Sequence, residues 1–322
     1  MEKSENNLVA WIAERFGRPD DADIPIGIGD DMAMVRAGSG EVLIAADMLM
    51  DGVHFDSAVH EPERIGRKAL AVNLSDCAAM AVRPRYALVS VALPNGWSME
   101  QAQRLFLGME KLAKQFDVRI IGGDTNSWDR PLVIDVSVVA EPWPGVKPVK
   151  RTGLQPNDLL GVTGWLGGSV AGHHLDFEPR VSQAKWLAEA FGNKLHAMMD
   201  LSDGLSIDAR RMCDASNMGI ELFAEILDFT ASPASRDAAL TDGRSVLDHV
   251  LNDGEDFELL YAVDVLSYTE LKRQEKKNPL NARNANPPHR MVGCAIEEPG
   301  LWLKRQDGSR ETIKPKGWQH FQ

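Results

Sequence analysis

The sequence predicts an α+β protein of two domains, each built of α/β layers. Three observations support this class. The chain has 322 residues, which is more than a typical single domain. Strand-like runs and helical spacings follow one another in both halves of the chain. Residues 141–148, which contain three prolines, separate the halves and form the best candidate for a linker. We therefore expect a first domain over residues 1–141 and a second over residues 149–322.

The first half is expected to begin with an amphipathic helix over residues 8–16. Two short strands around the turn at Gly38 and Gly40 follow, and residues 61–82 have the length and the alanine and leucine content of a buried helix. Ser98 and Gln101 have the spacing of a capping box. The other elements predicted here are a strand over residues 86–93, a helix over 102–116, and strands over 118–121 and 132–140 that flank a Gly122-Gly123-Asp124 turn.

The second half continues the alternation. A strand over residues 158–163 leads into a glycine-rich turn and a helix from Val170, an order that would present backbone N–H groups to an anion. The remaining predictions are helices over 182–191 and from 204 to about 216, a strand over 258–263, a surface loop over 276–289, and late strands over 291–296 and 301–304.

Composition and charge argue against several classes of protein. No run of about 18 apolar residues occurs, so no membrane span is predicted. The N-terminus lacks the basic-then-apolar layout of an export signal, and we expect a cytoplasmic location. A net charge of −12 disfavours nucleic acid as a partner. The three cysteines are widely spaced and form neither a disulfide framework nor a zinc pattern.

Aspartates recur where glycine turns meet apolar runs. The first such segment, residues 27–31, contains Asp30 and Asp31. The later acidic positions are Asp47, Asp76, Asp124, Asp200 and Asp203. One aspartate after a glycine is usually only a turn former. If all these carboxylates converge, however, their repulsion must be neutralised, and hard divalent cations with oxygen ligands are the usual means. The pattern therefore favours a magnesium site.

The chain lacks the common nucleotide-binding motifs. It has no P-loop, and residues 27–31 fail the dinucleotide fingerprint at its third glycine. An acidic metal site suits phosphoryl transfer, where metal ions neutralise charge on the phosphates. A phosphate acceptor needs little help from a base, because its second ionisation falls near pH 6. His54, Arg151 and Trp318 could contact substrate, although single residues of these types are more often structural.

Seven motifs, in order along the chain, closely resemble those of thiamine-monophosphate kinases. They lie at residues 27–31, 47–55, 68–76, 122–125, 200–205, 254–259 and 317–321. The superfamily also includes aminoimidazole ribonucleotide synthetase and selenophosphate synthetase. Asp-Gly-Val-His-Phe at 51–55 and Gly-Trp-Gln-His-Phe at 317–321 are the motifs that point to the kinase rather than to its relatives.

The resemblance implies a synthetase-like fold. An N-terminal domain that binds ATP and magnesium would form a β-barrel-like core with its twin in a homodimer, and a C-terminal α/β domain would complete the cleft. The implied reaction is ATP-dependent phosphorylation of thiamine monophosphate to the diphosphate over several magnesium ions, with no catalytic residue beyond the metal ligands.

Residue roles are also implied by motif. The metal ligands would be Asp30, Asp47, Asp76, Asp124, Asp200 and Asp203. The nucleotide contacts would be Gly123, Asp124, Arg151 and Ser202. The thiamine contacts would be His54, Glu255 and Trp318, since a carboxylate and an indole suit a cationic ring.

The chain departs from the family pattern at several positions. Ala45 and Ala46 precede Asp47 where a hydroxyl residue is usual, and Gly168 stands where the family has Gly-Asp-Ser. The six aspartates are spared, so metal binding is expected to survive. Two alternatives stay open: another ATP-dependent enzyme of the superfamily, of the purine-pathway synthetase type, or a catalytically weak homologue that binds nucleotide or thiamine phosphate.

Overall fold

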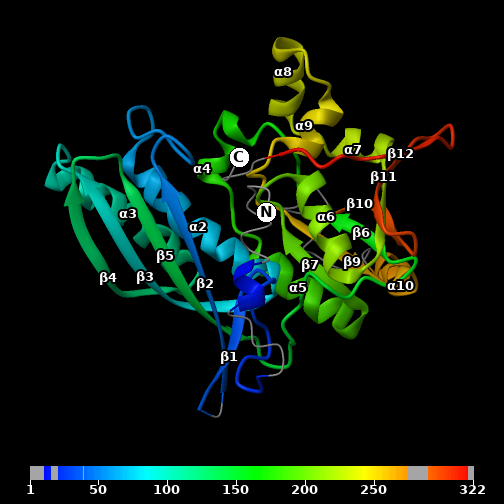
Figure 1. Ribbon diagram of the computed structural model, residues 1–322, viewed down its shortest axis with the longest axis horizontal. Coiled ribbons are helices and arrows are strands. Elements are labelled where there is room, and N and C mark those ends of the chain that lie inside the picture. The colour runs from blue at the N-terminus through cyan, green and yellow to red at the C-terminus, as the bar shows by residue number, and fades with distance from the viewer. Residues whose placement is uncertain (1–10, 16–20, 39, 275–288, 318–322) are drawn as a thin grey trace.

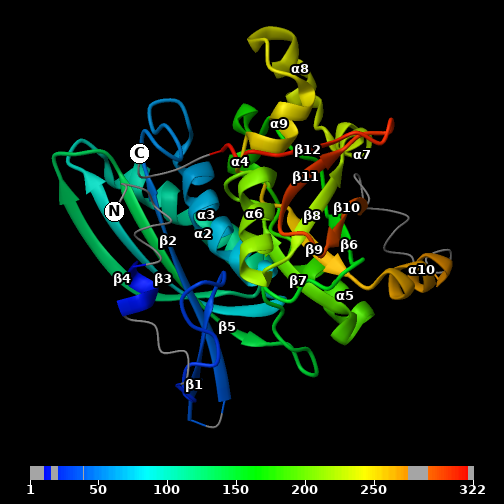
Figure 2. The same ribbon diagram turned by 45° about the vertical axis from the view of Figure 1, so that its right-hand side comes forward.

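The computed structural model describes residues 11–15, 21–38, 40–274 and 289–317 (Figure 1). Each half of the chain forms one β-sheet with helices packed against it, and the two sheets lie side by side (Figure 2). The predicted mixture of α and β layers is confirmed. The predicted domain boundaries stay a prediction. None of the helices in the described part of the chain has the length and apolarity needed to cross a bilayer.

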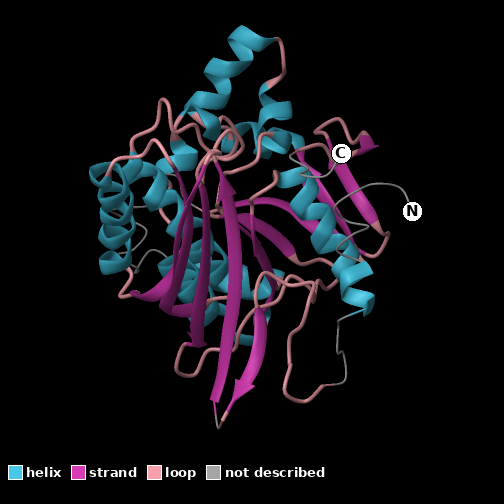
Figure 3. Ribbon diagram, turned by 60° about the vertical axis from the view of Figure 1, so that its left-hand side comes forward, coloured by secondary structure: helices cyan, strands magenta, loops and turns pink. Residues whose placement is uncertain are grey.

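The first sheet has five strands in the order β1-β2-β5-β3-β4. They are β1 (Ala33–Ala37), β2 (Gly40–Met50), β3 (Val82–Pro94), β4 (Arg119–Trp128) and β5 (Val133–Pro142). Neighbouring strands are antiparallel except β3 and β4. Helices α2 (Pro62–Ala79) and α3 (Met99–Gln115) cover one face (Figure 3). The opposite face leaves Ile44, Met48 and Leu88 exposed.

The predicted turn at Gly122-Gly123-Asp124 is wrong. These residues lie inside β4 and pair with β3. Gly123 has a φ of +147°, and a Cβ atom there would lie 1.8 Å from the carbonyl oxygen of Val89. The glycine is therefore explained by close approach of two strands rather than by a change of chain direction.

Helix α2 is the element shared by both halves of the molecule. It packs against α3 and the first sheet, and also against α4 (His173–Asp176), α5 (Val181–Phe191) and β7 (Leu195–Asp200). It ends at Ala79, earlier than predicted, because Ala81 turns the chain with a φ of +53° and Val82 begins β3. Residues from both sheets pack around it in one hydrophobic core.

The second sheet has seven strands in the order β12-β11-β8-β10-β6-β9-β7. Besides β7 they are β6 (Leu159–Val162), β8 (Gly219–Phe223), β9 (Leu259–Val263), β10 (Arg290–Ile296), β11 (Gly300–Lys304) and β12 (Arg310–Thr312). The other helices are α6 (Leu205–Ser216), α7 (Ala224–Thr230), α8 (Pro233–Asp242), α9 (Val246–Asn252) and α10 (Val265–Gln274). Sequence patterns did not predict β7, β8, β12 or α7 to α10.

Two local predictions were also tested. The capping box at Ser98 and Gln101 is confirmed, because both reciprocal hydrogen bonds form at the start of α3. Residues 11–15 are helical. The rest of the expected first helix, and most of the expected loop at 276–289, lie outside the described residues.

Candidate active site

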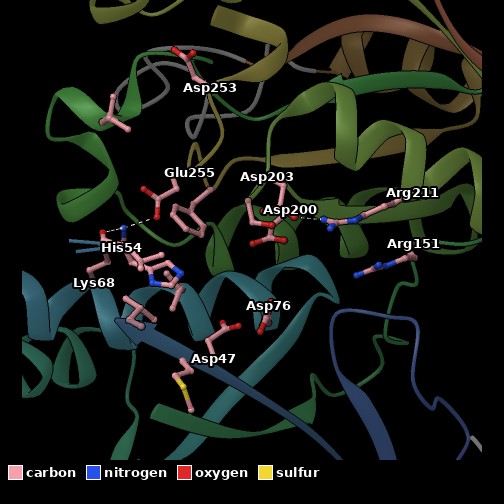
Figure 4. A pocket seen from close by; sticks show the side chains of 17 residues that line it. Asp47, His54, Lys68, Asp76, Arg151, Asp200, Asp203, Arg211, Asp253 and Glu255 are labelled. Atoms are coloured by element: carbon pink, nitrogen blue, oxygen red, sulfur yellow. Dashed lines mark hydrogen bonds and ion pairs between the residues drawn. The ribbon is translucent and has the colours of Figure 1, made fainter. Parts of the chain in front are cut away.

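A cavity of about 550 Å³ lies where α2 and the end of β2 face the loops of the second half (Figure 4). Its two ends differ in charge. One end carries aspartates together with Arg151 and Arg211, and the other carries His54, Lys68 and Glu255 (Figure 4). The lining also includes Met48, Leu49, Val53, Val72, Val170, Ser202, Asp253 and Phe257.

Three carboxylates meet at the acidic end, where Asp76 and Asp200, but not Asp31, line the cavity. Asp31, Asp76 and Asp200 each offer an oxygen atom, and these atoms all lie within 4.8 Å of one another. Asp31 lies in the loop before β1, Asp76 on α2, and Asp200 at the end of β7. The fold thus joins residues that are up to 169 positions apart in the sequence, and we call these three residues the aspartate cluster.

The aspartate cluster carries more negative charge than its neighbours neutralise. Burial raises the pKa of Asp31 to about 7; the charge of Arg151 opposes this shift, and the charges of Asp200 and Asp30 add to it. Burial also raises the pKa of Asp76 well above its usual value, with Asp47 as the next cause. The Oδ2 atom of Asp31 is buried and has no hydrogen-bond partner in the described part of the chain. Such an oxygen suits a hard cation.

Asp47 and Ser75 extend this environment. Burial raises the pKa of Asp47 to about 6 and that of Asp200 to about 6. The Ser75 hydroxyl donates to Asp200 Oδ2 at 2.5 Å and partly offsets the shift of Asp200. Asp47 therefore lies at the cavity wall as a further carboxylate that could share a cation with the aspartate cluster.

Arg151 is the cation in direct contact with the aspartate cluster. Its Nη2 atom donates to Asp31 Oδ1 at 2.8 Å, and its backbone N–H donates to Asp30 Oδ1 at 3.2 Å. Its Nε atom is buried and finds no hydrogen-bond acceptor among the described residues. Because Arg151 lines the cavity, its guanidinium group could donate to an oxygen of a bound phosphate.

Arg211 is a second cavity arginine, and the sequence analysis missed it. Its Nη1 atom contacts Asp203 Oδ2 and donates to Asp208 Oδ1 at 2.9 Å. Asp208 is fully buried and also accepts from the backbone N–H of Asp203 at 3.0 Å. Asp208 and Arg211 are three residues apart on α6, a spacing that could have identified the pair.

Lys68 was also missed, and it joins two predicted substrate contacts. Its Nζ atom donates to Glu255 Oε1 at 2.5 Å and to the carbonyl oxygen of His54 at 2.6 Å. Burial lowers the pKa of Lys68, and the charge of Glu255 opposes that shift. His54 is held further by the backbone N–H of Met50, which donates to its Nδ1 atom at 3.0 Å.

The structure brings most, but not all, of the predicted site residues to the cavity. Those that line it are Asp47, His54, Asp76, Arg151, Asp200, Ser202, Asp203 and Glu255. Gly123 and Asp124 lie on β4 and are not part of the lining; Asp124 is exposed and accepts from Asn126 Nδ2 at 2.7 Å. Trp318 lies outside the described residues. The roles assigned to all these residues remain predictions.

Asp30, which its motif predicts as a metal ligand, lies next to the aspartate cluster in sequence but is not one of its members, and its role stays a prediction. The motif assigned the metal-ligand role to Asp30, whereas the aspartate cluster contains Asp31. Asp30 Oδ1 instead accepts backbone N–H groups, from Asp31 at 3.1 Å and from Arg151 at 3.2 Å. Sequence spacing could not distinguish these neighbours, because the direction of each side chain depends on the backbone of the turn.

Comparison with known proteins gives one consistent result. Residues 29–141 match the family model "AIR synthase related protein, N-terminal domain". A thiamine-monophosphate kinase of Rhodopirellula baltica is 37% identical over 309 residues, which cover 92% of each protein. One of Bacillus subtilis is 32% identical over 324 residues, with 93% of this chain and 94% of the relative covered.

Solved structures agree with the sequence relatives. The structure described as AaThiL complexed with AMPPCP and TMP superposes on this chain with a TM-score of 0.76. The two are 27% identical, and the superposition covers 99% of this chain and 97% of the other. The resemblance therefore extends over both sheets and the cavity between them.

Proposed function

The chain belongs to the thiamine-monophosphate kinase family, and from this we propose that it transfers the terminal phosphoryl group of ATP to thiamine monophosphate, giving thiamine diphosphate and ADP. The AaThiL structure, which superposes over nearly the whole chain, was solved with AMPPCP and TMP. A cavity with an acidic end and a separate Lys68–Glu255 end suits two ligands that meet between them.

One observation carries the proposal most strongly, the unneutralised charge of the aspartate cluster. Asp31, Asp76 and Asp200 fit a divalent cation, because their oxygens are close together and Asp31 Oδ2 is buried without a partner among the described residues. We propose magnesium as the cofactor, held by these residues with Asp47 beside them. Bound there, magnesium supplies neutralisation of charge on the phosphate oxygens.

The side chains of this protein then bind and orient the two substrates. Arg151 offers its guanidinium group to a phosphate oxygen of the nucleotide, while Nη2 keeps its contact with Asp31. Glu255 places a carboxylate at the opposite end, which suits the cationic ring of thiamine. The acceptor phosphate carries its own negative charge near neutral pH, so the chain need not supply a base.

The proposal has two further parts, the oligomeric state and the location of the protein. The exposed face of the first sheet presents Ile44, Met48 and Leu88, which are 40%, 55% and 42% exposed. An apolar sheet face of this kind suits contact with the same face of a second copy, so we propose a homodimer. We also propose a cytoplasmic location, where ATP is available as the phosphoryl donor.

A direct assay tests the proposed function. The purified protein is incubated with ATP, magnesium and thiamine monophosphate, and thiamine diphosphate is measured by chromatography. We expect the diphosphate to form with magnesium and not with a chelator, and Asp76→Asn to be nearly inactive. Turnover with a purine-pathway substrate instead would favour the synthetase alternative. Tight nucleotide binding without turnover would favour the catalytically weak homologue.

A further inference from the structure

We propose that Lys68 is a positioning residue that shapes the acceptor end of the cavity by tying the His54 segment to the loop that carries Glu255. This inference rests on the proposed function and deepens it, because it names a residue that decides how well thiamine monophosphate binds.

Lys68 is a fully buried ammonium group with two defined partners. It belongs to α2 in the first half of the chain, whereas Glu255 lies 187 residues later, in the loop before β9. The Nζ atom lies 2.5 Å from Glu255 Oε1 and 2.6 Å from the carbonyl oxygen of His54 (Figure 4). A buried charge persists only when it is well paired, so these contacts fix the geometry on both sides of the cavity.

The loop that carries Glu255 has an unusual backbone. Gly254, Glu255 and Phe257 have φ values of +72°, +53° and +49°. Side-chain-bearing residues adopt this left-handed region only when surrounding contacts hold them there. The backbone N–H of Glu255 donates to the Ser202 carbonyl at 2.7 Å, and Lys68 holds the Glu255 side chain. The loop is therefore anchored from both its backbone and its carboxylate.

Neighbouring residues on α2 also contact the second half of the chain, independently of Lys68. Arg64 Nη2 donates to Asp176 Oδ2 at 2.6 Å, and Arg67 Nη2 donates to the Phe177 carbonyl at 2.6 Å. Phe177 in turn stacks on Phe257, with ring centroids 4.1 Å apart. Because these contacts remain when Lys68 is changed, the loss of Lys68 should alter the direction of Glu255 without separating the halves.

The two ends of the cavity should therefore respond differently to the loss of Lys68. Glu255 and His54 lie beside Lys68, whereas Arg151 and Asp200 lie toward the opposite end (Figure 4). A change at Lys68 should thus weaken binding of the acceptor and leave binding of the nucleotide almost unchanged. A purely structural role would instead change the two affinities together with the thermal stability.

The test compares Lys68→Met with the wild-type protein in steady-state kinetics. Methionine has a similar length but no N–H group. We expect the KM for thiamine monophosphate to rise about tenfold or more, the KM for ATP to change by less than about twofold, and Lys68→Arg to restore part of the acceptor affinity. Arg64→Met is the matched control, since it removes a cation from the same helix outside the cavity, and both KM values should stay unchanged.

A double variant keeps the test decisive if Lys68→Met folds poorly. The double variant Lys68→Met/Glu255→Met replaces both partners, so neither charge is left unpaired. Replacing a buried ion pair by apolar residues is often neutral for stability. We expect this variant to recover the thermal midpoint but not the acceptor KM. If the wild-type protein is active and either variant has an unchanged KM for thiamine monophosphate, the proposed role of Lys68 is overturned. Absence of wild-type turnover with thiamine monophosphate contradicts the proposed function instead.

Discussion

The two ends of the cavity differ in how their buried charges are neutralised. At the Lys68 end, the ammonium group and the Glu255 carboxylate lie 2.5 Å apart and neutralise each other within the chain. At the acidic end, the three carboxylates of the aspartate cluster meet with Arg151 as their partner. The first arrangement is complete in itself, whereas the second needs protons or a cation from solution.

Helix α2 sets the distance between these two ends. Lys68 and Asp76 both lie on it, eight residues apart, which corresponds to roughly 12 Å along the helix axis. The helix is buried between the two sheets and contacts both. The separation of the acceptor end from the metal end is therefore fixed by a rigid element rather than by a loop.

The largest expected effect comes from removing a charge of the aspartate cluster. Asp31→Asn should lower kcat about 10²–10³-fold, because the cluster loses an anionic ligand. The same change should raise the stability of the metal-free protein by about 1–3 kcal/mol, since a repelled buried charge disappears. Enzyme assays and denaturant unfolding without metal measure the two effects.

Asp30→Asn is the matched comparison for this prediction. Asp30 accepts backbone N–H groups at the edge of the aspartate cluster, so its loss should reduce kcat less than the loss of Asp31. If Asp30→Asn is the more damaging change, the metal-ligand role belongs to Asp30, as the sequence motif had predicted, and our assignment of Asp31 is wrong.

A change that affects both ends alike should lower stability without altering the balance between the substrates. A Cβ atom at Gly66 would lie 1.9 Å from the Leu105 carbonyl oxygen, where α2 and α3 cross. Gly66→Ala should therefore cost about 2–4 kcal/mol of unfolding free energy. Gly96→Ala is the control and should be nearly neutral, because an added Cβ atom there has no atom within 4 Å beyond the adjoining residues. A changed ratio of the two KM values in Gly66→Ala would argue that α2 does not position both ends.

The smallest expected effect concerns the ion pair between Arg64 and Asp176. Both side chains are well exposed, at 39% and 54%, so solvent screens their attraction. Asp176→Asn should change the unfolding free energy by less than about 1 kcal/mol and leave both KM values unchanged. A large loss of activity would show that contacts outside the cavity, such as this ion pair, also position the residues at the acceptor end.

The sequence predicted the acidic end of the site better than the Lys68 end. Aspartates beside glycine turns are visible as a pattern, and Asp76 and Asp200 do meet in space. Lys68 begins the motif at residues 68–76 but was given no role, because a lysine in a helix is ordinarily a surface residue and its partner is 187 positions away. Arg211 was missed although Asp208 is only three residues away, because an Asp–Arg pair at this spacing on a helix is ordinarily a surface ion pair.

The fold was predictable where the pattern was long and regular. Strands β2, β5 and β9 and helices α2 and α3 carry clear periodicity or length, and all were expected. The three helices over residues 224–252 are short and are interrupted by Pro233 and Gly243, so no window held a full helical pattern. The strand at Gly123 was read as a turn, since the close approach of Val89 is a tertiary contact.

The raised pKa values give the aspartate cluster a specific pH dependence. Burial raises the pKa of Asp31 from 3.8 to about 7. Between these values the folded chain keeps a proton that the unfolded chain has released, so the metal-free protein loses stability as the pH rises through this window. Magnesium should replace that proton, and its stabilising effect should therefore be larger at about pH 8 than at about pH 5. Thermal unfolding with and without magnesium measures the difference.

Calorimetric titration of magnesium in the presence of a non-hydrolysable ATP analogue tests the central claim most directly. The titration is made at about pH 6.5 in two buffers of different ionisation enthalpy, so that released protons are counted. We predict cation uptake coupled to proton release, with both reduced in Asp31→Asn. Two results would contradict a metal site at the aspartate cluster. One is that the protein takes up no magnesium. The other is that the wild-type protein and Asp31→Asn take up magnesium equally and neither releases protons.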